Sequence, residues 1–346
     1  MRRTMRHYYV VGPEQLAAVE EPVPEPGPGH VLISVTHTAL SPGSNLYVYR
    51  TGSYAGVWTG QREEAVYMGS GIVEAAGEGV TGLAPGDRVA MIGVGHQAYA
   101  TLPPEQVQKV PDGLSLRDAS LSYLAAWSVS ALHLAGYRAA ETVVVIGLGL
   151  VGASAALMAD QMGARVLGIE TDATRAGFAR GLGFGPVEEP DAPGARERIT
   201  AFLGETGADI ILETSGAWRG FQQAVALARD WTRIAVMGIY REPPPAELAL
   251  ALHRQLYTFP SKFHYQRLQI IGCGYDPPEV VAPNPHLATP RRNFAYTLER
   301  AAQGKLPLGK LVTHVMPADE IGEVMARMSA GDRSMVGVVF DWAAGC

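Results

Sequence analysis

The chain has 346 residues, a length that favours two domains over a single hydrophobic core. Hydrophobic residues make up 47% and charged residues 18%, as in ordinary globular proteins, and the formal net charge is −6. The sequence has no Lys- or Arg-rich block that would indicate a nucleic-acid partner, and no apolar stretch approaches the ~20 residues of a membrane span. With two cysteines and no apolar segment after the basic first residues, the composition predicts a reduced, cytoplasmic protein without a signal peptide.

The first 120 residues consist of short apolar runs separated by Gly- and Pro-rich turns. Residues 7–11 and 31–37 have the composition of strands, and residues 39–45 have that of a loop. A Gly-rich stretch over 69–80 leads into a turn at 83–90. Short strands punctuated in this way predict a compact, barrel-like β-rich module that ends near residue 120.

Beyond that module the pattern changes to alternating helices and strands, which predicts a doubly wound parallel sheet. A helical pattern over 116–136 precedes an apolar, β-branched strand at 142–146. The later expected strands are 165–170, 209–213, 233–237, 268–272 and 336–340, and the expected helices are 172–181, 195–204, 217–230, 293–302 and 319–329.

The turn after strand 142–146 reads Gly147-Leu-Gly149-Leu-Val-Gly152 and opens into a helix rich in Ala, Leu and Met. Gly147 allows a tight turn, Gly149 allows the backbone to approach a pyrophosphate, and Gly152 allows the helix to pack closely on the strand. The free N–H groups and the dipole at the start of that helix attract phosphate. Strand, turn, helix, second strand and terminal acid occur in the order that dinucleotide binding requires.

The acid at the end of the second strand, Glu170, indicates which dinucleotide is bound. A carboxylate there accepts hydrogen bonds from the hydroxyls of the adenosine ribose and repels a 2′-phosphate, so we expect NAD. Arg175 either softens that repulsion or is a solvated helix charge. Loops at the carboxyl ends of later strands are expected to line the nicotinamide half. The expected cofactor-binding residues are Gly147, Gly149, Leu150, Val151, Gly152, Glu170, Arg175, Ser215 and Gly238.

Together with the turn Leu83–Val89 and the stretch Gly69–Glu74, these landmarks resemble the medium-chain dehydrogenase/reductase superfamily over nearly the whole chain. The resemblance implies an α/β protein with a GroES-like β-rich catalytic domain and a doubly wound parallel-sheet Rossmann domain. We expect the catalytic domain to comprise residues 1–122 and 276–346, and the NAD-binding domain to comprise residues 123–275. The resemblance also implies a homodimer or homotetramer that acts on a small-molecule substrate.

The positions that bind catalytic zinc in zinc-dependent members of that superfamily hold unsuitable residues here. Those members use a Cys, the His of a Gly-His-Glu motif and a later Cys. The corresponding positions are at or near Ser41, at Tyr67, and at Leu121 or Ser122. Zn²⁺ requires thiolate, imidazole or carboxylate ligands, and the four-Cys structural zinc lobe is missing as well. We therefore expect no metal.

The segment Ser41–Gly52 is similar to a subgroup written S-P-G-T-E…Y-R-G, which includes bacteriochlorophyllide-dehydrogenase-like and sugar- or cyclitol-type dehydrogenases. Asn45 replaces the acid of that motif. The piece from Tyr49 to Tyr54 is also similar to zinc-free quinone reductases, whereas residues 290–293 fit the first subgroup better.

Without a metal, a side chain has to stabilise or protonate the alkoxide that accompanies hydride transfer. Tyr67 replaces a His ligand; its phenol, with a pKa of about 10, either donates this proton or fills the space left by zinc. His96 lies on a segment that borders the substrate pocket in the superfamily, and it is either a proton relay or a structural residue. Ser41 either binds the reacting oxygen or is a turn residue before Pro42.

These features favour a zinc-independent oxidoreductase that transfers a hydride between NAD(H) and a secondary alcohol or ketone of a polyol, cyclitol or sugar-like substrate. The alternative enzyme is an NAD(P)H-dependent quinone or enoyl reductase, against which Glu170 counts. The alternative from another class is a non-catalytic nucleotide-binding protein that has kept the fold. Comparing NADH with NADPH separates the first two, and NAD binding without turnover indicates the third.

Overall fold

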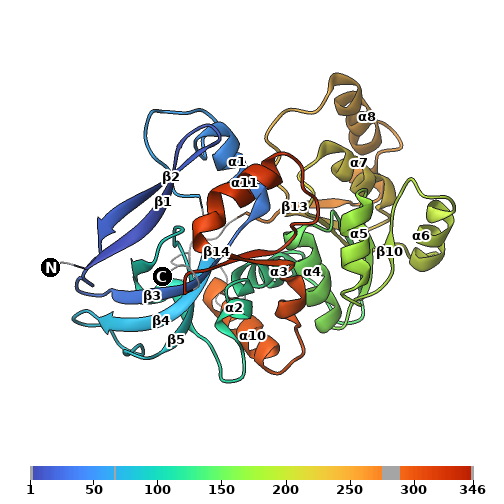
Figure 1. The fold of residues 1–346 in the computed structure, drawn as a ribbon. Helices are drawn as coiled ribbons and strands as arrows, with labels where there is room; N and C mark the ends of the chain where they lie inside the picture. The colour runs from blue at the N-terminus through green and yellow to red at the C-terminus, as the bar shows by residue number, and fades with distance from the viewer. Residues whose placement is uncertain (1–2, 66–67, 275–288, 344–346) are drawn as a thin grey trace. The chain divides into compact units, whose positions relative to one another are not determined.

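The computed structural model describes residues 3–65, 68–274 and 289–343. The chain divides into two compact units. We call the first the split unit, because it combines Met1–Tyr123 with Phe294–Cys346, the blue and red ends of the chain in Figure 1. We call the second, Leu124–Asn293, the inserted unit.

The unit boundaries differ from the expected ones mainly on the carboxyl-terminal side. The first falls at 123/124 rather than 122/123, and the second falls at 293/294 rather than 275/276. Asn293 is the last residue of the inserted unit, and its side-chain amide donates a hydrogen bond to the Ser130 hydroxyl at 2.8 Å. The start of the late helix is thereby tied to the inserted unit.

The inserted unit contains a six-stranded sheet in which all neighbouring strands are parallel. Its strands are β8 (Thr142–Ile146), β9 (Arg165–Ile169), β10 (Val187–Glu188), β11 (Ile210–Glu213), β12 (Arg233–Val236) and β13 (Gln269–Gly272). Their order is β10-β9-β8-β11-β12-β13, the order of a Rossmann sheet. The chain reverses its direction of winding between β8 and β11, and in such sheets ligands bind outside the carboxyl ends of the strands at this point.

Helices precede or connect these strands (Figure 1), and some of them share a buried apolar cluster with the sheet. They are α3 (Ser122–Leu134), α4 (Leu150–Gln161), α5 (Ala173–Arg180), α6 (Ala195–Leu203), α7 (Trp218–Leu227), α8 (Ala246–Tyr257) and α9 (Lys262–Tyr265). One buried cluster joins Ile211 of the sheet to Phe221 and Leu252 of the helices. Within the described parts of the chain, every helix is too short or too polar to cross a bilayer.

The split unit contains a two-stranded sheet, β1-β2, and a seven-stranded sheet in the order β14-β15-β3-β4-β5-β7, with β6 also paired to β3. The strands are β1 (Thr4–Gly12), β2 (Gln15–Pro22), β3 (Val31–Ala39), β4 (Met68–Ala76), β5 (Arg88–Ile92), β6 (Tyr99–Leu102), β7 (Val107–Lys109), β14 (His314–Pro317) and β15 (Val338–Asp341). The helical segments are α1 (Pro42–Thr51), η1 (Pro104–Gln106), α2 (Leu116–Ala119), α10 (Pro290–Ala302), η2 (Leu308–Leu311), η3 (Ala318–Glu320) and α11 (Ile321–Ser329). The expected combination of a GroES-like β-rich domain and a Rossmann domain is confirmed.

Three sequence-based expectations for local structure are wrong. Residues 39–45 are not a loop throughout, because α1 begins at Pro42, and proline at the first helical position needs no hydrogen-bond donor. The helix expected over 116–136 is interrupted between α2 and α3. The sequence analysis expects no helix between β12 and β13, yet α8 and α9 lie there.

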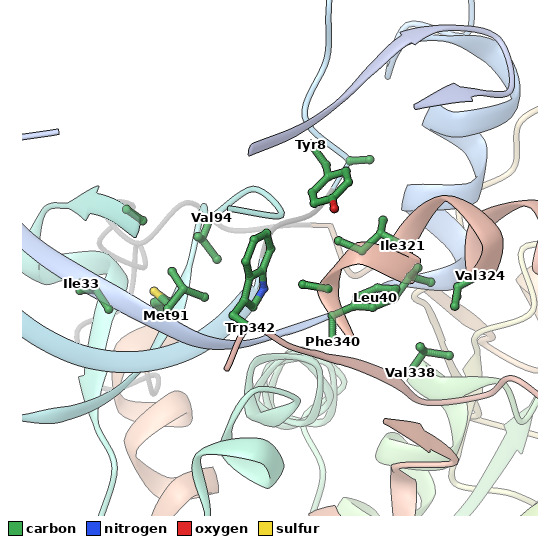
Figure 2. Close-up of a cluster of buried hydrophobic side chains, with 14 of the residues drawn as sticks. Tyr8, Ile33, Leu40, Met91, Val94, Ile321, Val324, Val338, Phe340 and Trp342 are labelled. Carbon is green, nitrogen blue, oxygen red and sulfur yellow. The ribbon is translucent and has the colours of Figure 1, made fainter. Parts of the chain in front are cut away.

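The core of the split unit is completed by the end of the chain. Strand β15 pairs with the early strand β3, antiparallel, and places Phe340 in the interior. Figure 2 shows Phe340 and Trp342 among side chains from the first hundred residues, including Leu40 and Met91. Trp342 is held at its backbone as well, since its N–H donates to the Thr36 carbonyl at 3.0 Å.

Replacing Phe340 with alanine tests this dependence on the last strand. The side chain is fully buried, so Phe340→Ala is expected to lower the free energy of unfolding by about 3–5 kcal/mol through lost burial and an unfilled cavity. Val315→Ala on the neighbouring strand β14, where the side chain is 45% exposed, is the control and is expected to cost less than about 1 kcal/mol. Urea unfolding measures both, and equal small losses would contradict the packing described.

Candidate functional site

Backbone crowding explains the glycines of the turn between β8 and α4. Gly147 has φ +86°, and a Cβ there would lie 2.9 Å from Ser215 Cα. A Cβ on Gly152 would lie 1.8 Å from the carbonyl oxygen of Gly147, so α4 packs against the turn itself. A Cβ on Gly149 would meet nothing within 4 Å. The turn is therefore crowded on its inner side and open at Gly149.

The open side of the turn coincides with the start of α4. Gly149 is the residue before the helix, and Leu150, Val151 and Gly152 form its first turn. The first N–H groups of a helix have no partner within the helix, and their dipole favours an anion. Leu150 is buried, so its side chain packs in the interior at the start of the helix. This geometry suits a phosphate group.

Glu170 follows β9, and its carboxylate is buried against the same turn. One oxygen accepts the backbone N–H of Leu148 at 2.7 Å, and the other accepts those of Thr171 and Asp172 at 2.8 and 3.0 Å. The Thr171 hydroxyl donates to that second oxygen as well, at 3.5 Å, so four donors face the carboxylate. Glu170 thus ties the end of β9 to the glycine turn, and its contact with a ribose stays a prediction.

Arg175 lies in the first turn of α5, where its backbone N–H donates to the Asp172 carboxylate at 3.0 Å. Its Nε is buried and has no hydrogen-bond partner among the described residues. Both interpretations of Arg175, a charge that softens the repulsion of a 2′-phosphate and a solvated helix charge, stay open. A contact with the cofactor stays a prediction.

The turn after β11 lies against the glycine turn, and the turn after β12 lies against the turn after β11. The Thr214 hydroxyl donates to the Gly147 carbonyl at 2.6 Å. A Cβ on Gly216 would lie 2.9 Å from the Ile239 carbonyl oxygen, and one on Gly238 would lie 2.3 Å from the Gly216 nitrogen. Ser215, the residue before Gly216, is exposed. The carboxyl ends of β8, β11 and β12 therefore form one continuous backbone surface at the point where a dinucleotide is expected.

The sequence analysis does not identify two side chains behind this surface, those of Glu213 and Tyr240. The Glu213 carboxylate is fully buried at the end of β11, and it accepts a hydrogen bond from the Tyr240 hydroxyl. The signal in the sequence is an acid at the last position of an otherwise apolar buried strand, because such a charge needs local partners.

Ser41, expected to contact substrate, lies at the end of β3 and is 3% exposed. Its backbone N–H donates to Asn45 Oδ1 at 2.6 Å, so the side chain of Asn45 fixes the bend into α1. Asn45 is fully buried, and its Nδ2 has no hydrogen-bond partner among the described residues. Tyr67 lies outside the described residues, so its position relative to Ser41 is not part of the described geometry.

His96 lies in the interior of the split unit rather than on a surface. It is 1% exposed, and its Nδ1 lies 2.8 Å from the hydroxyl of Thr38, which also accepts the indole N–H of Trp342 at 3.0 Å. Burial, with a smaller contribution from His7, lowers the pKa of His96 to about 3. The ring is therefore neutral near pH 7. A relay role for His96 stays a prediction, and this environment disfavours it.

A zinc ion does not fit the donor set at the positions that the superfamily uses. Leu121 is aliphatic and fully buried, and the Ser122 hydroxyl donates to the Ala119 carbonyl. Throughout residues 3–65, 68–274 and 289–343, no three His, Cys, Asp or Glu side chains are grouped so that they could hold a metal. Hydroxyls and apolar groups are poor zinc ligands.

Comparison with known proteins relates this geometry to dehydrogenases. A family model described as "Zinc-binding dehydrogenase" matches residues 151–275. The 2-dehydro-3-deoxy-L-galactonate 5-dehydrogenase of Pseudoalteromonas atlantica is 23% identical over 362 aligned positions, which cover 95% of this chain and 96% of that protein.

Solved structures share the fold over the whole chain. A protein from E. coli CFT073, described as a short chain alcohol dehydrogenase complexed with NADH, superposes with a TM-score of 0.79 at 18% identity, covering 98% of this chain and 99% of that one. A structure from Sinorhizobium meliloti 1021 bound to NADP has a TM-score of 0.78 at 18% identity and covers 98% of this chain and 100% of that one.

The strand order and the glycine turn are those of a dinucleotide-binding sheet. The family model and the relative that aligns along nearly the full length of the chain are both dehydrogenases. These comparisons support the resemblance of the chain to the medium-chain dehydrogenase/reductase superfamily.

Proposed function

We propose that this protein is an oxidoreductase that transfers a hydride between NAD(H) and a secondary alcohol or ketone of a polyol or sugar-like substrate, without catalytic zinc. The observation that carries the proposal is the opening at Gly149, at the start of α4 and at the switch point of a Rossmann sheet. The name of the Pseudoalteromonas relative, which acts on a sugar acid derivative, supports the substrate class.

The preference for NAD rests on Glu170. Its carboxylate ends β9 beside the glycine turn, where the adenosine ribose lies in Rossmann sheets. A 2′-phosphate would be repelled by that charge, whereas a ribose hydroxyl can donate a hydrogen bond to a carboxylate at this position. One structural neighbour holds NADH and another holds NADP, so the fold is compatible with both.

In the reaction that we propose, the bound nicotinamide supplies or accepts the hydride. The residues of this chain bind the cofactor and manage the proton. Gly149 and the first turn of α4 accommodate the pyrophosphate, and Glu170 accepts from the ribose. Tyr67, in place of a zinc-binding His, donates the proton to the alkoxide oxygen, and Ser41 hydrogen-bonds that oxygen. A phenol with a pKa of about 10 is protonated at pH 7, as this role requires.

Gly149→Ala separates cofactor binding from stability. An added methyl meets no protein atom within 4 Å, so the free energy of unfolding should change by less than about 0.5 kcal/mol. The same methyl would occupy space that the pyrophosphate needs, and we expect NADH affinity to fall at least about tenfold, or 1.4 kcal/mol. Calorimetry measures both. The control is Gly177→Ala on α5, where a Cβ also meets nothing within 4 Å and NADH affinity should not change.

The wild-type protein is titrated with NADH and NADPH in the same series. Tighter binding of NADH supports the role of Glu170. Preference for NADPH would instead favour a quinone or enoyl reductase, and binding of neither would overturn the proposed function.

Tyr67→Phe tests catalysis without zinc. Loss of the phenolic proton should lower turnover by about 10²–10⁴-fold, the usual contribution of general acid–base catalysis, while NADH affinity stays within about twofold. Tyr54→Phe, which alters an exposed tyrosine of the same unit, should keep full turnover. Elemental analysis should find substoichiometric zinc. Stoichiometric zinc, or an active Phe variant, contradicts the mechanism, and NAD binding without turnover in the wild type indicates a non-catalytic protein.

We also propose that two copies pair through β13. It is the terminal strand of its sheet, and Ile270 is partly exposed on it. An exposed strand edge without charge or proline tends to pair with another strand, and twofold symmetry makes such an edge complementary to itself. Exposed aromatic side chains lie nearby in sequence around an open pocket of about 390 Å³: Tyr257, Phe259, Phe263 and Tyr265.

Ile270→Asp tests the pairing. We expect the wild type to sediment at twice the 36.8 kDa of one chain, and the variant to sediment as a monomer, because the dimer would bury an unpaired charge. Val315→Asp changes an exposed residue on β14, the terminal strand of the other large sheet, and should remain dimeric. A dimeric Ile270 variant would rule out this interface.

A further inference from the structure

The Glu213 carboxylate is the most enclosed charge behind the proposed cofactor surface, and the proposed chemistry does not use it. It is fully buried. One oxygen accepts the backbone N–H of Ser215 at 2.9 Å as well as the Ser215 hydroxyl, and the other accepts the Tyr240 hydroxyl. All three donors are neutral. They belong to two different turns, one after β11 and one after β12.

Two glycines leave room for this carboxylate, because a side chain at either position would crowd it. A Cβ on Gly220 would lie 2.9 Å from Glu213 Oε1, and a Cβ on Gly238 would lie 2.7 Å from Oε2. The backbone of Glu213 contributes as well, since its carbonyl accepts the N–H groups of Met237 and Gly238 at 2.8 and 2.9 Å. Both turns are therefore fitted around one acid, with backbone and side-chain contacts to each.

Tyr240 is fixed at its ring as well as at its hydroxyl. Its ring centroid lies 4.4 Å from that of Trp218, and the Trp218 indole N–H donates to the Glu242 carbonyl at 2.7 Å. Burial, followed by the hydrogen bond to Glu213, raises the pKa of Tyr240 above its ordinary value. The phenol therefore stays protonated at physiological pH and remains a hydrogen-bond donor to the acid.

The two turns that Glu213 joins lie on one side of the glycine turn, and Glu170 lies on the other. In the sheet order, β9 flanks β8 on the side of Glu170, and β11 and β12 follow β8 on the side of Glu213. A dinucleotide bound across the switch point places its adenosine half toward β9 and its other half toward β11 and β12. Contacts made by Glu213 should thus affect one half of the cofactor alone.

We propose that Glu213 and Tyr240 are positioning residues that hold the turns after β11 and β12 in the conformation required by the nicotinamide half of the cofactor. This inference rests on the proposed function. Neither side chain touches the reacting atoms. Their hydrogen bond sets the spacing of Ser215 and Gly238, which we expect to lie beside the nicotinamide ring.

The test compares NADH with ADP-ribose, which lacks the nicotinamide, by calorimetry on the full-length protein. Tyr240→Phe removes one hydrogen bond to the acid and keeps the ring. It should weaken NADH binding by about tenfold and change ADP-ribose binding by less than about twofold. Tyr137→Phe is the matched control: it removes one phenolic hydrogen bond, 3.0 Å to the Met162 carbonyl, elsewhere in the inserted unit, and should change neither affinity.

Glu213→Ala, measured in the same way, should show the same selectivity with a larger loss. Unchanged NADH affinity in Tyr240→Phe, or equal losses of NADH and ADP-ribose, would overturn the positioning role. A wild-type protein that binds neither ligand would overturn the proposed function itself. Wild-type binding with non-selective variants would overturn only this inference.

Discussion

The contact on which the inserted unit depends is the approach of α4 to the backbone of the turn that precedes it. Only a hydrogen at Gly152 fits beside the carbonyl oxygen of Gly147, and that oxygen also accepts the hydroxyl of Thr214. The helix start, the end of β8 and the turn after β11 are therefore held by one carbonyl group. The open position at Gly149 next to so crowded a turn is a place where a phosphate can approach helix N–H groups.

Acidic side chains secure the same edge of the sheet in two places. Glu170 and Glu213 both end buried strands, and both accept backbone N–H groups from the turns that follow them. Burial of a carboxylate is costly unless it is hydrogen-bonded, so each acid enforces a specific loop conformation as well as contributing charge. The carboxyl edge of the sheet is therefore held by an acid at two points.

Sequence reasoning found the parts of the fold that have a clear periodicity. The alternation of strands and helices after residue 142 and the glycine turn were sufficient for the Rossmann sheet, because buried parallel strands and close helix packing leave strong patterns. It failed where tertiary context decides. Pro42 and Gly43 suggested a loop and begin a helix instead, and α8 lies in a segment whose prolines obscured its pattern. A free histidine side chain titrates near neutral pH. The burial of His96 beside Thr38, which lowers its pKa, is visible only in the structure.

The pairing of β15 with β3 has a consequence for how the chain is made. Strand β3 ends at Ala39 and its neighbour begins at Val338, so the ribosome must synthesise the whole segment between them before that part of the sheet can close. All strands of the inserted unit are synthesised before β15. This unit can therefore fold before β15 emerges, as domains do during synthesis. Until Phe340 and Trp342 emerge, the apolar side chains that they cover remain open to solvent or to chaperones, and the nascent chain is most exposed to misfolding in that interval.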